Sequence, residues 1–475
     1  MTPAPPSPSV GPSRRRRRRL RLRIGILIVM LALATAMGRF AYLRITLTPT
    51  PRLEHWEAEL AALDPPLPGA LAADEARALI SNRPWEKHPA LTSFSNFNPT
   101  DILAGAWTIA DPKTAAVEKV FKSPDFNAGR DRMREAVLKE WSIPWPLEPS
   151  APIPVLAEYR AWAQWLTAHS RWARESQGDT SAAVEDWLTT FRMGRQLTRS
   201  HSMLPWLVEM AIVGPVSQEM MMASRETLDP LDTASMVRRI DEILGPVPPA
   251  DRLLAGERIE AQHTVESVYV RQGGDWLVVS EVAKYRNAGL GMILPGNPSR
   301  LWNLFSPLYH DIHTARDCVD RCYASLKACT DAAVSYRIDA KFPGTPTITP
   351  PNVLAGFPGE SLSMIRRFFS MYYDSRTHIE AAAAMLAIRE YHRRHGRYPE
   401  TLELLVPEFL PRLPVDYADR QTLRYRRTND SYVLYSVGLN GIDDGGHSGS
   451  KSAWAWSFVP ENPDVVFTEI RRGQR

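Results

Sequence analysis

The sequence has few cysteines and lacks the motifs by which several large enzyme classes are recognised. No His-Glu-x-x-His, phosphate-binding Walker loop or dinucleotide fingerprint occurs in its 475 residues, which excludes the enzymes that depend on those motifs. The only cysteines are Cys318, Cys322 and Cys329. An odd number so close together does not form a disulfide framework. We interpret them as small buried apolar residues on one predicted helix, with a metal or redox site containing Cys322 as the alternative.

Basic charge is scarce outside the N-terminus. The formal net charge is +4, but eight of the 57 Lys and Arg residues, and no acid, lie in residues 1–23. The remaining 49 basic residues are therefore outnumbered by the 53 acidic residues. We expect no nucleic-acid partner, because a basic surface is not predicted beyond this tail.

An apolar segment follows the arginines directly. Residues 1–23 are expected to form a disordered basic tail in the cytoplasm, and residues 24–43 a membrane anchor. The positive-inside rule then predicts a single-pass protein of the inner (cytoplasmic) membrane, with its C-terminus exported to the periplasm or cell surface. Ala34-Thr35-Ala36 would also suit a signal peptidase, so a cleaved signal remains the alternative. Either way, the bulk of the chain is exported.

The fold class predicted for the exported part is mainly α. Residues 44–69 should form a juxtamembrane helix and a linker, because Leu53, Trp56, Leu60 and Leu63 repeat at helical spacing. Residues 70–377 are predicted to be an irregular multi-helix domain. Its most regular part is a series of helices over 156–175, 182–199 and 204–222, the first two joined by Gly178-Asp179 with Thr180 or Ser181 as the cap. This pair resembles a tetratricopeptide-type hairpin, although no 34-residue period repeats.

The residues from 378 to 475 predict a small α+β domain. An Ala-rich helix containing Tyr391 should end at Gly396, and Tyr398-Pro399 makes a corner. A short helix and several prolines follow. Residues 423–427 and 432–437 alternate apolar and polar residues on either side of a four-residue turn, which predicts a β-hairpin.

These motifs resemble the C-terminal region of the major pseudopilins of type II secretion. The matching residues are Tyr391, Gly396, Tyr398-Pro399, Leu405-Val406-Pro407, Leu413-Pro414-x-Asp416, Tyr432 to Tyr435 and Ser436 to Asn440. The resemblance covers about the last hundred residues. The prepilin cleavage and methylation box of that family is absent, which argues against assembly into a pilus. As a whole, the chain is similar to uncharacterised bacterial membrane-anchored proteins that carry such a tail.

The loop after the hairpin is the main candidate site. Asn440, Asp443 and Asp444 provide hard oxygen ligands, and the glycines among them allow the chain to turn around a cation. In the pseudopilins the corresponding loop binds calcium, and a later Asp closes the site. The resemblance therefore implies a calcium site formed by Asn440, Asp443, Asp444 and Asp464, completed by carbonyls near Val437 and Leu439. The long insertion from 447 to 462 and the Asn at position 440 depart from the family, and a bare Asx/Gly turn is the alternative.

Two other groups of polar residues have both a structural and a functional interpretation. His310, His313 and Asp317 share one face of a predicted helix, as metal ligands or as a solvated surface. Glu257, Glu260 and Glu266 lie on another helix with Arg258 and His263. They could include an acid/base pair, but exposed helix charges are the default interpretation.

Three hypotheses for the function follow. The first is a non-enzymatic, membrane-anchored envelope protein whose calcium-stabilised tail contacts another protein, of unknown identity. The second is an envelope hydrolase with a site assembled from residues of the helical domain. The third is a subunit associated with a secretion system or pseudopilus.

Overall fold

The computed structural model divides into two compact units. Unit 1 comprises Met1–Arg52, Thr264–Cys318 and Ile348–Phe357, and unit 2 comprises Leu53–His263, Val319–Thr347 and Pro358–Arg475. The residues that the structure describes are 14–46, 53–63, 73–92, 94, 99, 111–139, 154–225, 233–248, 250–270, 276–278, 303, 312–332, 356–438, 440–447 and 464–469. Predictions for 1–13, the linker at 64–69, Leu439 and most of the 447–462 insertion lie outside them.

Unit 1 contains the apolar N-terminal helix. Helix α1 (Arg14–Ile45) has one window long and apolar enough to cross a membrane, Ile26–Leu43, with a mean hydropathy of 2.0 and none of it buried by protein. The prediction that residues 14–23 are disordered was wrong. Arginine is a good helix former, and propagating an existing helix costs far less than nucleating one, so the helix continues from the apolar segment into the arginines.

The second part of unit 1 begins inside helix α10 (Ala250–Glu266). This helix ends at Glu266, and β1 (Tyr269–Val270) then pairs antiparallel with β2 (Trp276–Leu277). β-branched and aromatic residues favour a strand at this position. The Glu266 carboxylate is 1% exposed and lies 3.3 Å from Arg316. Arg316 belongs to helix α12 (Ile312–Ala332), which continues into unit 2.

Unit 2 is mainly helical. Its helices before α10 are α2 (Leu53–Leu63), α3 (Ala73–Ser81), α4 (Pro112–Phe121), α5 (Pro124–Ala136), α6 (Pro154–Gln177), α7 (Thr180–Leu197), α8 (Met203–Ala223) and α9 (Thr233–Leu244), with 3-10 turns η1 (Pro84–Lys87) and η2 (Pro89–Leu91). The bounds of α2 confirm the amphipathic helix predicted from its leucine spacing. Trp56 and Leu60 of this helix are buried against Ile259.

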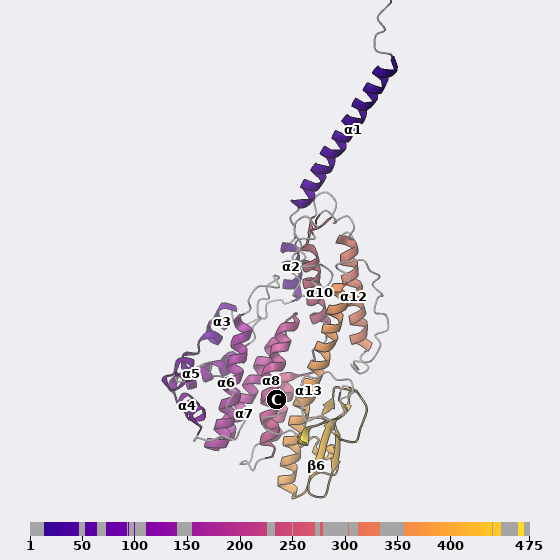
Figure 1. Ribbon diagram of the computed structural model, residues 1–475. Coiled ribbons are helices and arrows are strands. Elements are labelled where there is room, and N and C mark those ends of the chain that lie inside the picture. The colour runs from indigo at the N-terminus through magenta and orange to yellow at the C-terminus, as the bar shows by residue number, and fades with distance from the viewer. Residues whose placement is uncertain are drawn as a thin grey trace, which may run out of the picture. The chain divides into compact units, whose positions relative to one another are not determined.

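Helices α6, α7 and α8 lie side by side and form the centre of unit 2 (Figure 1). The chain reverses between α6 and α7 at Gly178, whose φ of +67° favours glycine. The cap of α7 is Asp179, whose carboxylate accepts a hydrogen bond from the Ala182 amide at 2.9 Å, and not Thr180 or Ser181 as we predicted. Because Asp179 forms this bond one position before Thr180, the helix begins at Thr180 and not at residue 182.

Four large aromatic side chains of α6 form a stripe along the helix and belong to the core. Trp162 is 1% exposed and packs edge-on against Trp85 at a centroid distance of 4.7 Å. The remaining members of the stripe are also buried: Tyr159, Trp165 and Trp172. Met220 and Met221 of α8 have no exposed surface and fill the core.

The C-terminal residues of unit 2 pack on one long helix. Helix α13 (Gly356–His395) runs without interruption through position 378, where we predicted a domain boundary, and ends before Gly396 at a φ of +68°. The elements that follow are η7 (Leu402–Leu405), β3 (Val415–Asp416), β4 (Gln421–Thr422), β5 (Arg424–Arg427), β6 (Tyr432–Ser436), β7 (Val465–Val466) and η8 (Phe467–Glu469).

A small antiparallel sheet lies near the C-terminus. The predicted hairpin is confirmed, with Arg424 opposite Tyr435 and Arg427 opposite Tyr432, and β7 pairs with the other edge of β6. Leu434 and Leu405 are fully buried in a hydrophobic cluster that also contains residues of α6, α7 and α13. The sheet and the helical body therefore share one core.

Candidate functional site

The strand β6 leads directly into the predicted calcium loop. The chain turns there at four glycines with positive φ, which are Gly438, Gly441, Gly445 and Gly446. At Gly446 an added Cβ would lie 3.1 Å from the side chains of Tyr435 and Val433. A larger residue is thus disfavoured by both its backbone angle and its contact with the sheet.

The sheet brings Asp464 to this loop across the long insertion. Asp464 directly precedes β7, and Val465 pairs with Ser436 at the end of β6. The Gly446 amide donates a hydrogen bond to Asp464 Oδ2 at 2.7 Å. On the other side of the loop, Asp443 Oδ1 accepts hydrogen bonds from the Tyr435 hydroxyl at 3.0 Å and the Gly445 amide at 2.9 Å.

Asp464 is a buried carboxylate with an unused acceptor. Its exposed fraction is 3%, and its Oδ1 has no hydrogen-bond partner among the described residues. Burial raises the pKa of Asp464, and the nearby carboxylates of Asp443 and Asp444 raise it further, against the opposing effect of the Gly446 and Asp444 amides. Asp464 is buried with an unused oxygen and is repelled by Asp443 and Asp444. A bound hard cation would reduce this repulsion.

Asn440, the fourth predicted ligand, uses its side-chain oxygen within the loop. The Asn440 side-chain oxygen accepts a hydrogen bond from the Ile442 amide at 3.0 Å, which is the Asx turn considered as the alternative. Within the described residues, no group of three or more His, Cys, Asp or Glu side chains is placed closely enough to hold a metal ion. Backbone carbonyls and a shift of the exposed Asp443 and Asp444 would have to complete a calcium shell.

Asp416 has a structural part in this loop that the sequence did not reveal. It is fully buried, and burial raises its pKa. One of its oxygens accepts from the Ser436 hydroxyl at 2.8 Å, and the other from the Val437 amide at 3.0 Å and from Arg424 at 3.2 Å. Asp416 thereby ties the corner before the hairpin to the start of the loop. The only indication of this role in the sequence was the place of Asp416 in the Leu-Pro-x-Asp motif.

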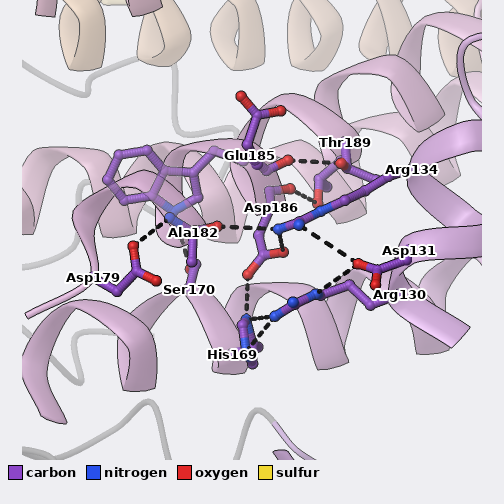
Figure 2. A network of polar contacts seen from close by, with 12 residues as sticks. Arg130, Asp131, Arg134, His169, Ser170, Asp179, Ala182, Glu185, Asp186 and Thr189 are labelled. Carbon is purple, nitrogen blue, oxygen red and sulfur yellow. Dashed lines mark hydrogen bonds and ion pairs between the residues drawn. The ribbon is translucent and has the colours of Figure 1, made fainter. Parts of the chain in front are cut away.

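The helical body contains a second polar cluster, shown in Figure 2. His169 of α6 and Asp186 of α7 are 2% and 0% exposed, and His169 Nδ1 lies 2.5 Å from Asp186 Oδ2. Arg130 of α5 is 2.7 Å from the opposite ring nitrogen, and Arg134 donates to Asp186 Oδ1 at 2.8 Å. A His–Asp pair can serve as a general base only when the second ring nitrogen faces a substrate. Here Arg130 occupies that position, so the cluster clamps α5 to α6 and α7.

Glu257, Glu260 and Glu266 of α10 are not exposed helix charges, contrary to our default interpretation. Glu257 is partly buried and accepts hydrogen bonds from the Met203 amide at 2.6 Å and the Ser202 hydroxyl at 3.3 Å. Burial raises the pKa of Glu257 and lowers the pKa of the neighbouring His201. Glu257 therefore satisfies the first turn of α8, which accounts for its position without an acid/base role.

His313 and Asp317 are exposed on α12, in keeping with a solvated face, and His310 lies outside the described residues. Cys322 is 1% exposed and Cys318 is partly exposed. In comparisons with known proteins, no family model matches the chain, and no curated protein or solved structure matches it.

Proposed function

We propose that this chain is a non-enzymatic, membrane-anchored protein of the bacterial cell envelope, with a pseudopilin-like tail that calcium stabilises and that contacts another protein. The observation that carries the calcium part is Asp464, whose buried carboxylate keeps an unused oxygen beside Asp443 and Asp444. A bound calcium ion would supply positive charge there, held by these three carboxylates and by carbonyls of the loop, with Asn440 as a further ligand.

The anchor supports the location. The exposed apolar window of α1 is preceded by eight arginines, so we place the N-terminus in the cytoplasm and residues from Leu53 onward outside the inner membrane. Alkaline phosphatase fused after Leu63 should be active. An inactive phosphatase together with an active cytoplasmic reporter at that position would reverse the orientation.

The calcium site is tested by thermal unfolding of the full chain in detergent, with calcium, magnesium or chelator. Extracellular calcium modules have a Kd of about 10⁻⁴–10⁻³ M. At about 1 mM calcium the tighter constant gives roughly 1.4 kcal/mol of stabilisation, which raises the melting temperature by a few degrees. Magnesium should do much less, because it prefers a rigid octahedral shell.

Two variants make this measurement specific. Asp464→Asn should abolish the calcium effect without lowering stability in chelator, because it also removes repulsion from Asp443 and Asp444. Asp430→Asn is the matched control, since Asp430 is exposed in the hairpin turn, and it should respond to calcium as the wild type does. If calcium and chelator give the wild type the same melting temperature, the loop is only a turn.

The protein contact can be located by photo-crosslinking in intact cells. Leu404 and Ile442 are apolar side chains of the tail with exposed fractions of 48% and 59%. A photoreactive amino acid at either position should crosslink one discrete protein partner. The same amino acid at Leu138, which is 68% exposed after α5, should not. Crosslinks to secretion-system components would favour the secretion-associated hypothesis, and equal labelling from all three positions would contradict a tail-specific contact.

A further inference from the structure

The arginines at the start of α1 form a dense cluster of positive charge. The helix that carries them continues into the apolar window Ile26–Leu43. Eight arginines lie between positions 14 and 23, whereas the other end of α1 carries two, Arg39 and Arg44. The backbone is helical from Arg14 onward, so this charge is not on a separate loop but is fixed in line with Ile26–Leu43.

The length of α1 sets how far this charge lies from a membrane. At about 1.5 Å per residue, the 18-residue window spans roughly 27 Å, close to the ~30 Å of a hydrocarbon core. Residues 14–23 extend about 15 Å further on the same axis. Positions 21 and 23 then fall at the depth of the headgroups, and positions 14–19 stay within about one to two Debye lengths (~8 Å each) of them.

A helix that begins with so many arginines is stabilised by nearby negative charge. Consecutive arginines place like charges at every i, i+3 and i, i+4 pair, which destabilises a helix in water. The first turn contains no acidic residue that would compensate. Phosphate groups could supply the missing negative charge, because a guanidinium binds a phosphate through two parallel hydrogen bonds.

We propose that residues 14–23 bind the headgroups of anionic phospholipids, which gather around this end of α1 and keep it helical. The proposal rests on the membrane anchoring proposed above. It favours a lipid over a nucleic acid because the apolar window on the same helix holds the arginines at the bilayer surface, where each basic residue contributes about 1 kcal/mol, or a factor of roughly five, to binding.

Hydrogen exchange of the full chain in nanodiscs tests this directly. One nanodisc contains phosphatidylcholine alone, and the other contains equal parts of phosphatidylcholine and phosphatidylglycerol. Backbone amides of residues 14–23 should exchange at least ~10-fold more slowly in the anionic nanodisc, since several arginines bind together. Slow exchange over Ile26–Leu43 in both nanodiscs reports that the anchor is inserted, and its absence would count against the anchoring alone.

Two variants separate charge from helix propensity. With Arg14 to Arg19 each changed to lysine, the lipid dependence should persist, because the charge is retained. With the same six changed to glutamine, a neutral good helix former, the difference between the two nanodiscs should be much smaller than in the wild type, because only Arg21 and Arg23 remain. Equal exchange of the wild type in the two nanodiscs would overturn the proposal. Stronger protection by a homopolymeric RNA in the neutral nanodisc than by phosphatidylglycerol would overturn it in favour of nucleic acid.

Discussion

Glu209 should make the folded protein less stable as the pH rises. This residue of α8 is 1% exposed, and its Oε2 has no hydrogen-bond partner among the described residues. Burial raises its pKa from the ordinary value of 4.5 to about 8, and the nearby Arg376 only partly opposes this effect. Tyr372 of α13 and Arg195 of α7 share this environment. Near neutral pH, Glu209 is therefore a neutral acid in the folded chain and a charged carboxylate in the unfolded chain.

The sign of the pH dependence follows from this difference in bound protons. Below pH 4.5 both states carry the proton, and the stability contribution of Glu209 is fully present. Between pH 4.5 and about 8 only the folded state holds it, so the free energy of unfolding decreases. The interval corresponds to on the order of 5 kcal/mol as an upper bound.

Glu209→Gln tests this reasoning, because glutamine keeps the shape without the charge. We expect the variant to match the wild type near pH 4.5 and to exceed its free energy of unfolding by a few kcal/mol at pH 8. The assay is urea unfolding of the full chain in detergent, followed by tryptophan fluorescence over that pH range.

A second glutamate on α8 provides the matched control. Glu219 lies 3.0 Å from Arg174, and both side chains are buried. Glu219→Gln should destabilise the protein, by roughly 3–5 kcal/mol for breaking a buried pair. If both variants destabilise at pH 8, or if Glu209→Gln shows the same slope with pH as the wild type, then Glu209 is ionised in the folded chain and the argument fails.

Two further predictions concern close packing. Gly256→Ala should destabilise the protein although alanine favours helices, because its Cβ would lie 2.2 Å from the His201 carbonyl oxygen. An unchanged or higher melting temperature would show that α10 is not packed this closely on the start of α8. Leu405→Ala should cost about 2–5 kcal/mol in urea unfolding, since this side chain is fully buried, whereas its neighbour Leu404, 48% exposed, should tolerate alanine within about 0.5 kcal/mol. Equal costs at both positions would place Leu405 outside the core.

The elements predicted well are those whose signal is local. The leucine spacing of α2, the glycine stop after α13 and the alternation of β5 and β6 each depend on residues within a few positions of one another. The capping of α7 by Asp179 was missed because several residues in a row could serve as caps. The extension of α1 into the arginines was missed because charge pattern alone favours disorder, while an adjoining apolar helix favours propagation.

The buried charges could not be predicted, since their partners are distant in sequence. Asp186 meets Arg134 from a position 52 residues away, and Glu257 meets Met203 from a position 54 residues away. Alone, each acid on a helix resembles an exposed charge, because nothing near it in the sequence is its partner. Asp464 shows the same effect, since its place beside the loop depends on β7 pairing with β6 after the long insertion.

The contacts of the tail with the body imply that the proposed calcium loop does not act alone. Arg412, which follows η7, binds Glu380 of α13 at 2.6 Å and Asp241 of α9 at 2.8 Å. Arg225, at the end of α8, donates hydrogen bonds to the carbonyls of Phe467 and Thr468, only a few residues after Asp464. A cation that ordered Asp464 would hold β7 and η8 in place, and through Arg225 it would also hold the end of α8. Calcium should therefore stabilise the helical body together with the tail, in one cooperative transition, because both share a single core.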